Sequence, residues 1–308
     1  MSMRDITGKS RTKRTATART SVRCGEAGQE ALANEQVPKG NPIEITETAT
    51  LLAPKKTDEL IPHCHNIPVE NCEVVITTTD WGATIDVTVE AVARTGVEME
   101  ALTAASVAAL TLYDLLKPVE DDICIGNTEL VNKEGGSSTF EDRYEIKELT
   151  AAVVVTSDGT YEGTREDRSG KILKETLSEK GLSVEEYVVL PDESEEIREE
   201  LMRLCEEKEM DIVATTGGTG PGPRDVTADV TEELIDRELP GIAEAMRSHG
   251  QERTPYAMFS RGVVGQKGNT LIVNFPGSSN GTREGLDALF PGLKHFFKMR
   301  GTRSGGHS

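Results

Sequence analysis

Two stretches of the chain carry side chains that could move protons. The run His63-Cys64-His65 places two imidazoles and a thiol on consecutive residues. Further along, Asp114 and Lys117 stand three positions apart, a spacing that puts a carboxylate and an ammonium on the same face of a helix. Groups of these types act as general acids and bases near neutral pH, and the cations among them can also hold an anionic substrate.

The His-Cys-His run allows three interpretations. In an extended segment, His63 and His65 point to one face and Cys64 points to the other, which separates the thiol from the imidazoles. A structural zinc site needs about four Cys or His ligands in paired spacings, and the other histidines lie in the second half of the chain. An acid/base site and a partly exposed segment without a chemical role are the other two interpretations. A zinc-dependent hydrolase is the rival that metal analysis tests.

The ordinary explanation of the Asp114 and Lys117 pair is a surface salt bridge. The pair, however, ends the almost uncharged stretch ALTAASVAALTLYDLLK, which we expect to form a largely buried helix that Pro118 stops. A charge pair at the end of a buried helix costs free energy, so we predict that it has a functional role. Glu98 and Glu100 precede the same apolar run.

A further group of candidates lies in the second half of the chain. The stretch DIVATTGGTGPGPRDVT runs from a hydrophobic strand into the glycine-rich turn 217–220 and then to Asp225, at the start of a helix. Glycines allow tight turns, and N–H groups at a helix N-terminus can approach phosphate. The spacing is neither that of a Walker loop nor the Rossmann G-x-G-x-x-G pattern. A purely structural turn remains open, as does an N-cap role for Asp192 in the stretch LPDESEE.

The composition limits the classes of function. The 308-residue chain has a net charge of −19, so most of its surface repels nucleic acid, and an anionic substrate needs a local cationic pocket or a bridging metal. No uninterrupted apolar run approaches the roughly 18 residues of a membrane span, and the basic N-terminus lacks the apolar core of a signal peptide. Five widely spaced cysteines argue for reduced thiols. We expect a cytoplasmic protein with no nucleic-acid partner and no membrane partner.

The elements that must position these groups change in character along the chain. Two alternating strands that turn near Asp80-Trp81-Gly82, followed by the Ala/Leu-rich helix, predict an α+β first domain of the ferredoxin-like kind. Further on, strands and helices alternate, which predicts a three-layer α/β domain with a mostly parallel sheet. A charged, Gly/Ser-rich stretch separates the two patterns. We predict domains at 1–134 and 150–308, joined by a linker at 135–149.

The first half resembles the cyclic pyranopterin monophosphate synthase family. The resemblance rests on GVEMEALTAASVAALTLYDLLKPV, LIPHCHN, KGNPIEITETATLLAPKKTDELIP and LVNKEGG. It implies an α+β subunit, assembled as a hexamer with sites at subunit contacts. It also implies conversion of 3′,8-cyclo-7,8-dihydro-GTP to cyclic pyranopterin monophosphate with release of pyrophosphate, and no cofactor.

The same resemblance implies the roles of individual residues. The family has an apolar residue where His63 stands and a proline where Asn66 stands, so we centre the acid/base site on His65. The basic N-terminal arm matches loosely, and we expect it to be a disordered or subunit-wrapping tail. The catalytic residues implied are Asp114, Lys117, Lys39, His65 and Lys133, without a choice of which lysine is the base. The substrate-binding residues implied are His63, Cys64, His65, Glu98, Met99 and Glu100.

The second half resembles the molybdopterin-binding, or molybdopterin adenylyltransferase, family. The motifs VVTSD, LPDESE, TTGGTGPGPRDVT, MFSRGVVG and LIVNFPGSSNG carry the resemblance, which implies the molybdopterin-binding fold and transfer of AMP from ATP to molybdopterin with Mg²⁺. Asp192 and Asp225 are the catalytic acids and metal ligands that it implies. The nucleotide-binding residues implied are Gly217, Gly218, Thr219, Gly220 and Ser278, with Ser157 and Asp158 near the pterin.

Together the two resemblances predict a bifunctional enzyme of molybdenum cofactor biosynthesis. Its partners are the cyclised GTP intermediate, molybdopterin and ATP, and we expect a homo-oligomer, a trimer or a hexamer. The alternative is an active cyclase fused to a non-catalytic pterin-binding, oligomerising module. Consumption of ATP discriminates between the two.

Overall fold

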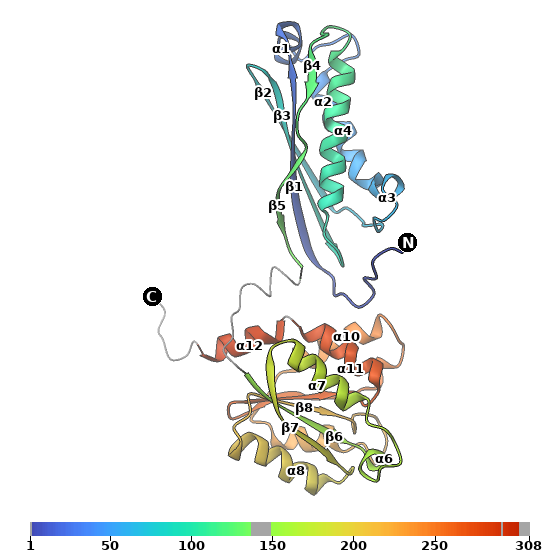
Figure 1. The fold of residues 1–308 in the computed structure, drawn as a ribbon, viewed down its shortest axis with the longest axis vertical. Coiled ribbons are helices and arrows are strands. Elements are labelled where there is room, and N and C mark those ends of the chain that lie inside the picture. The colour runs from blue at the N-terminus through green and yellow to red at the C-terminus, as the bar shows by residue number, and fades with distance from the viewer. Residues whose placement is uncertain (1, 137–148, 291, 302–308) are drawn as a thin grey trace. The chain divides into compact units, whose positions relative to one another are not determined.

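The structure is a computed structural model that describes residues 2–136, 149–290 and 292–301. The chain divides into two compact units, with the division after residue 142 (Figure 1). Of the predicted linker, residues 137–148 lie outside the described residues.

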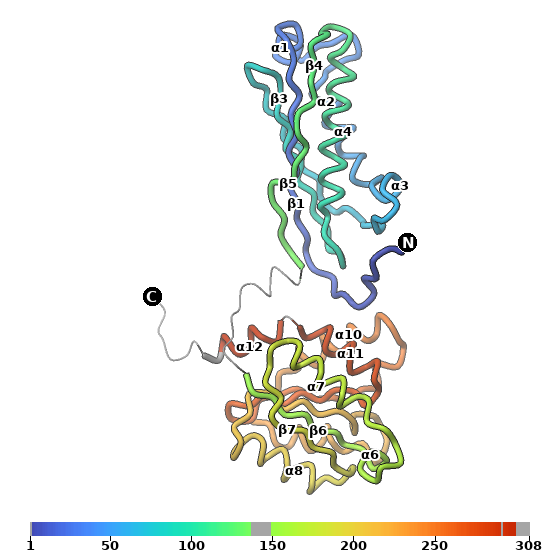
Figure 2. The backbone as a smooth tube through the Cα atoms, in the orientation of Figure 1, coloured from blue at the N-terminus to red at the C-terminus, as the bar shows by residue number. Residues whose placement is uncertain are grey.

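The first unit is built on an antiparallel sheet. Its strand order is β2-β3-β1-β4, and β5 also pairs with β1, so that β5 and β1 run side by side in the backbone trace (Figure 2). The strands are β1 (Thr12–Cys24), β2 (Asn71–Thr79), β3 (Gly82–Ala93), β4 (Ile123–Ile125) and β5 (Glu129–Glu134). The helices are α1 (Glu26–Ala33), α2 (Pro42–Leu52), the 3-10 segment η1 (Ala53–Lys56), α3 (Thr57–Leu60) and α4 (Glu98–Leu116).

Three predictions from the sequence concern these elements. The predicted hairpin is confirmed, because β2 and β3 pair antiparallel around the turn at 80–81. The predicted helix is confirmed as α4, which ends just before Lys117 and Pro118. The expected N-terminal tail is wrong from Thr12 onward, because that segment is the central strand β1, hydrogen-bonded to β3 along its length. Alternating polar residues made this strand look like a solvated arm.

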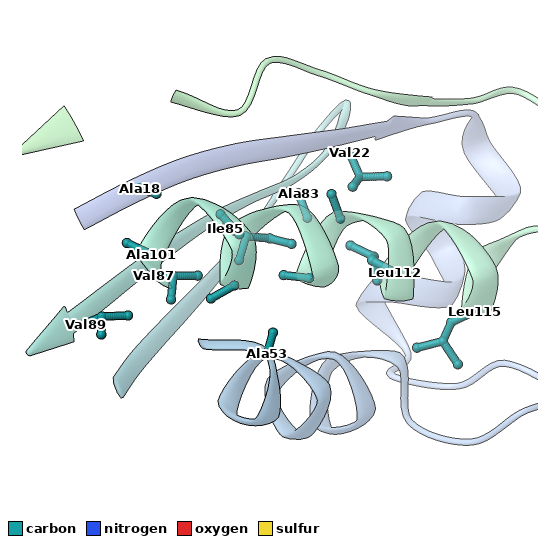
Figure 3. Packing of buried hydrophobic residues seen from close by; sticks show 14 of the residues in the cluster. Ala18, Val22, Ala53, Ala83, Ile85, Val87, Val89, Ala101, Leu112 and Leu115 are labelled. Atoms are coloured by element: carbon teal, nitrogen blue, oxygen red, sulfur yellow. The ribbon is translucent and has the colours of Figure 1, made fainter. Parts of the chain in front are cut away.

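Helix α4 packs on one face of the sheet and forms the core with it. Ile85, Val87 and Val89 of β3 are fully buried in this core (Figure 3). Along the strand they alternate with polar residues that are less buried. The facing side of α4 carries mostly alanines, which let the helix approach the strands closely, and Leu112 fills the far end. By length and composition alone α4 could cross a bilayer, but half of that stretch is buried inside this unit. Truncating Leu112 to alanine would cost about 3 kcal/mol of stability.

The second unit has a six-stranded sheet in the order β7-β6-β8-β11-β10-β9. Strands β7, β6, β8 and β11 are parallel, whereas β10 pairs antiparallel with β11 and with β9, so the sheet is mixed. The prediction of a mostly parallel sheet therefore holds for four strands, and it missed the short strand β10 and the edge strand β9 beyond it. The strands are β6 (Leu149–Thr156), β7 (Leu182–Leu190), β8 (Ile212–Thr216), β9 (Arg237–Glu238), β10 (Val264–Lys267) and β11 (Thr270–Phe275).

Helices cover both faces of this sheet, which gives the three layers that the sequence predicts. Leu173 of α7 and Leu286 of α11 belong to the core on one face, whereas Ile197 of α8 and Val230 of α9 belong to the core on the other. The helices are α6 (Asp158–Tyr161), α7 (Ser169–Glu179), α8 (Ser194–Met202), α9 (Thr227–Leu234), α10 (Pro240–Gln251), α11 (Ser279–Leu289) and α12 (Gly292–Gly301). The short segments are η2 (Arg203–Glu207) and η3 (Ala257–Phe259).

Candidate active sites

A carboxylate held between two lysines lies at the C-terminal end of α4. Lys117 Nζ is 2.6 Å from Asp114 Oδ1, and Lys39 Nζ is 2.5 Å from Asp114 Oδ2. Lys39 comes from the segment between α1 and α2, and it also donates to the backbone carbonyl of Asp114 at 2.9 Å. The hydrogen bonds from Lys117 and Lys39 lower the pKa of Asp114 to about 2, and Asp114 in turn raises the pKa of Lys117. All three side chains are partly exposed, so this end of the helix presents two ammonium groups to a ligand.

A buried acid lies at the opposite end of α4. Glu100 is only 3% exposed, and within the described part of the chain its Oε2 has no hydrogen-bond partner. Burial raises the pKa of Glu100 to about 7. Glu98, the first residue of α4, lies 3.4 Å from Nζ of Lys133 on β5. This end of α4 therefore combines a carboxyl group that can exchange a proton at neutral pH with a carboxylate–ammonium pair.

The His-Cys-His run lies in the loop between α3 and β2, not on a strand. Cys64 donates its N–H to the carbonyl of Ile61 in a turn, His63 is exposed, and Cys64 and His65 are partly buried. Burial raises the pKa of the Cys64 thiol, and the charge of Glu100 raises it further, which places the loop at the Glu100 end of α4. No three His, Cys, Asp or Glu side chains among the described residues are grouped as metal ligands. That part of the chain therefore offers no set of side chains that could hold the zinc ion of that interpretation.

The predicted residues of the first half therefore form two groups. Lys39, Asp114 and Lys117 lie at one end of α4, whereas Glu98 and Glu100 lie at the other. Sixteen residues of helix at 1.5 Å per residue separate the groups by roughly 24 Å. Within one copy of the chain, the structure does not bring the predicted residues to a single point.

In the second unit a cavity of about 600 Å³ opens where strands β6 and β8 end. The glycine-rich turn that follows β8 forms one wall. Gly217 and Gly218 have φ angles of 107° and 59°, and a Cβ on Gly217 would lie 2.0 Å from the carbonyl oxygen of Thr156. Only glycine fits this approach, and it leaves the backbone of the turn bare toward the cavity. The predicted residues that line the cavity are Ser157, Asp192, Gly217, Gly218, Thr219, Gly220, Asp225 and Ser278.

Two aspartates in this cavity suit a divalent cation. Asp192 Oδ2 accepts the N–H of Asp158 at 3.1 Å, but Asp192 Oδ1 is buried without a partner in the described part of the chain. Burial raises the pKa of Asp192. Asp225 Oδ2 accepts the N–H of Gly222 at 2.9 Å, which orients that carboxylate. A hard cation such as Mg²⁺ prefers oxygen ligands, and an orphaned carboxylate oxygen beside a second carboxylate fits that preference.

Two predicted roles change in the structure. Asp192 is not the cap of α8, because the N-cap position is Glu193. Asp158 does not line the cavity, since Arg224 binds it through Nε at 3.2 Å and Nη2 at 2.8 Å while also reaching Glu193 at 2.9 Å. Hydrogen bonding to the backbone of Asp192 and to Arg224 lowers the pKa of Asp158. Asp158 therefore fixes the position of Asp192, while its neighbour Ser157 caps α6 and faces the cavity.

Sequence reasoning missed part of this cavity. The stretch TREDRS, between α6 and α7, supplies Arg165, Glu166, Asp167, Arg168 and Ser169 to its lining. Its one signal in the sequence is a run of charges following the first strand of the domain. A second cavity of about 640 Å³, also missed, lies between α10, η3 and α11. Ser278 and Ser279 line both cavities, so the two adjoin at the N-terminus of α11.

The comparisons with known proteins divide the chain in the same way. Residues 3–136 match the MoaC family, and residues 152–295 match the probable molybdopterin binding domain. The molybdenum cofactor biosynthesis bifunctional protein of Chlorobaculum tepidum is 36% identical over 99% of this chain and 96% of its own length. The cyclic pyranopterin monophosphate synthase of Geobacillus thermodenitrificans is 41% identical over 44% of this chain and 86% of its own length. The molybdopterin adenylyltransferase of Helicobacter pylori is 40% identical over 49% of this chain and 86% of its own length.

Proposed function

The chain belongs to the family of bifunctional molybdenum cofactor biosynthesis proteins, and on that premise we propose the function of each domain. The first domain is a cyclic pyranopterin monophosphate synthase, and the second is a molybdopterin adenylyltransferase. The observation that carries the proposal is the identity of 36% along 99% of the chain, with both family models in the same order. We take 1–134 and 150–308 as the two domains and 135–149 as the linker.

In the first domain we assign the phosphates of the substrate to the lysine end of α4. Lys39 and Lys117 both pair with Asp114, and they neutralise the pyrophosphate that leaves as the pterin and the cyclic phosphate form. Asp114, with its pKa near 2, stays ionised and orients both lysines rather than taking a proton itself. His65, Glu100 and Lys133, with Glu98, Met99 and Cys64, belong to the pterin-forming end, where Glu100 can give or take a proton.

A second copy of the chain completes this site in our proposal. General acids and bases act within hydrogen-bond reach of the reacting atoms, and about 24 Å of helix separates the two groups within one copy. A neighbouring copy can bring its Glu100 end of α4 to the Lys117 end of the first copy. The two copies then place the proton-exchanging group and the lysines around one substrate. Closed symmetric assemblies make such sites in equal numbers, which suits a trimer or a hexamer.

We further assign the first domain to the ferredoxin-like kind. The chain order is a strand, helices, two strands, a helix and a strand, and the sheet order is β2-β3-β1-β4. This is the order of the split β-α-β motif, with β5 as an addition paired to β1.

In the second domain the cavity with the glycine-rich turn takes the reacting phosphates. Asp192 and Asp225 hold Mg²⁺, which supplies positive charge at the phosphoryl oxygens when bound. The N–H of Gly217 donates to the carbonyl of Phe275 at 3.4 Å, so the turn residues Gly218 to Gly220, together with the N-terminus of α11 at Ser278, are the backbone that we assign to the same phosphates. The adjoining cavity, with Tyr256, Met246 and Arg247 in its lining, takes the pterin ring. The cavities that we assign to the two substrates adjoin at Ser278 and Ser279.

We place both activities in the cytoplasm. All five cysteines are free thiols, as a reducing compartment requires. The net charge of −19 disfavours nucleic acid, and α4 is used in the core of its domain.

Two assays of the full chain test the proposal separately. The cyclised GTP intermediate should yield cyclic pyranopterin monophosphate, detected as a fluorescent oxidised pterin. Molybdopterin and MgATP with added pyrophosphatase should release phosphate. A protein that binds molybdopterin but consumes no ATP would instead make the second domain a pterin-binding, oligomerising module.

A further inference from the structure

We propose that Arg165 binds the β- and γ-phosphates of the nucleotide and stabilises the departing pyrophosphate in the second domain. The inference rests on the proposed adenylyl transfer and adds to it a residue of this chain that no motif in the sequence marks. Three observations carry it: the position of Arg165 in the cavity wall, the way its loop is fixed, and the balance of charges around the cavity.

The loop that carries Arg165 is anchored on both sides of it. On one side the N–H of Arg165 donates to the carbonyl of Gly159 at 2.8 Å, and Thr164 Oγ1 donates to the same carbonyl at 3.0 Å. On the other side Asp167 accepts the N–H of Gly170 at 2.8 Å and the hydroxyl hydrogen bond of Tyr187. Burial, with Asp167 as a lesser cause, raises the pKa of Tyr187, so its hydroxyl remains a donor. A loop fixed in this way loses little entropy when a ligand binds.

Of the two guanidinium groups in the cavity wall, that of Arg165 is the one that is not paired with a carboxylate of the described residues. Four carboxylates line the cavity, Glu166, Asp167, Asp192 and Asp225, against two guanidinium groups, Arg165 and Arg168. Arg168 lies 3.4 Å from Glu166, which also contacts Lys171 at 3.1 Å. Arg165 has no ion-pair partner among the residues that the structure describes. A triphosphate carries about four negative charges, of which one Mg²⁺ offsets two, so a wall this acidic needs a further cation.

The reaction shows where that cation acts. A terminal phosphate oxygen of molybdopterin attacks the α-phosphorus of ATP and forms a new P–O bond. The bond between the α-phosphorus and the oxygen bridging to the β-phosphorus breaks, and pyrophosphate leaves with that electron pair. Charge therefore builds up on the β-phosphate, and a guanidinium can donate two parallel hydrogen bonds to it. An ordinary solvated arginine on an exposed loop would make no such contact.

The test compares Arg165→Ala and Arg165→Lys with Arg198→Ala in the full chain. Arg198 is a matched control because it lies on α8, pairs with Glu233 and lines neither cavity. Isothermal titration measures the affinity for Mg-pyrophosphate and, separately, for AMP. We expect Arg165→Ala to weaken pyrophosphate binding about tenfold or more while AMP affinity stays within about twofold, with Arg165→Lys in between. The control should match the wild type in both titrations.

The outcomes separate this inference from the function on which it rests. If the wild type binds Mg-pyrophosphate and Arg165→Ala binds it equally well, the role of Arg165 is wrong and the adenylyltransferase assignment stands. Equal weakening for pyrophosphate and AMP also overturns the role, because the loop as a whole would then be disturbed. A wild-type chain that binds neither AMP nor Mg-pyrophosphate removes the adenylyltransferase assignment, and the role of Arg165 with it.

Discussion

Asp114 in the first domain and Asp192 in the second are the same side chain in opposite surroundings. Asp114 is half exposed and held by two lysines, and its pKa falls to about 2. Asp192 is partly buried, has one oxygen without a partner among the described residues, and has its pKa raised. Under the proposed function, the same acidic chain offsets phosphate charge with its own ammonium groups in one domain, and it leaves carboxylate oxygens open for a cation in the other.

The largest effect is expected when a carboxylate in the cavity of the second domain is neutralised. Asp192→Asn removes a proposed Mg²⁺ ligand, so we expect adenylyl transfer to fall by about 10³-fold, with activity recovering little at high Mg²⁺. Asp236→Asn is the matched control, because Asp236 pairs with Lys267 at 3.3 Å and lines neither cavity. It should shift the midpoint of thermal unfolding more than it shifts the Mg²⁺ dependence. Equal Mg²⁺ titrations for wild type and Asp192→Asn would contradict the contrast.

In the first domain the lysines should carry the effect. Lys117→Ala removes one of the two ammonium groups at Asp114, and we expect synthesis of cyclic pyranopterin monophosphate to fall about 10²-fold. Adenylyl transfer by the same protein should not change. Lys56→Ala, which breaks an exposed pair with Glu59, serves as the control and should leave both activities intact. A Lys117→Ala protein with normal turnover would remove the lysine end of α4 from the site.

The buried acid at the other end of α4 predicts a pH dependence of stability. Burial raises the pKa of Glu100 from 4.5 to about 7, so between these values the folded chain keeps a proton that the unfolded chain has lost. The free energy of unfolding should therefore decrease as pH rises through this window, by on the order of 3 kcal/mol. Urea unfolding followed by the fluorescence of Trp81, the chain's single tryptophan, reports on this domain. Glu100→Gln should flatten the pH dependence of the free energy of unfolding. An unchanged pH dependence would mean that a group other than Glu100 causes it.

The smallest effect is expected in an experiment that tests whether two copies of the chain share the active site of the first domain. Lys117→Ala and Glu100→Gln damage opposite ends of α4, so each protein alone should be nearly inactive. After the two proteins are unfolded, mixed in equal amounts and refolded together, some sites combine intact ends from different copies. Roughly a quarter of wild-type activity should return if assembly is random and each site takes one end from each of two copies. No recovery in a mixed assembly would mean that each copy builds its site alone.

Much of this molecule could be predicted from local pattern. The alternation of Ile85, Val87 and Val89 with polar residues indicates a strand with one buried face, and the alanines of α4 indicate a closely packed helix. The family resemblances are confirmed by the family models. The short strands β9 and β10 were beyond prediction, because they are two and four residues long and carry no alternating pattern. The N-terminal segment was mispredicted for a related reason. Its many Thr and Arg residues are typical of a solvated arm, although every second residue from Ala16 to Cys24 is buried.

The sequence by itself determined the family, the two kinds of chemistry and most of the residues that we propose take part, because residue types and their spacing are carried along the chain. Only the tertiary structure decided which of those residues meet. It separated Lys117 from Glu100 by a helix length, turned Asp158 away to Arg224, and brought Arg165 to the wall that holds Asp192. Such distances depend on how strands pair and helices pack across long separations in sequence, and spacing along the chain does not encode them directly.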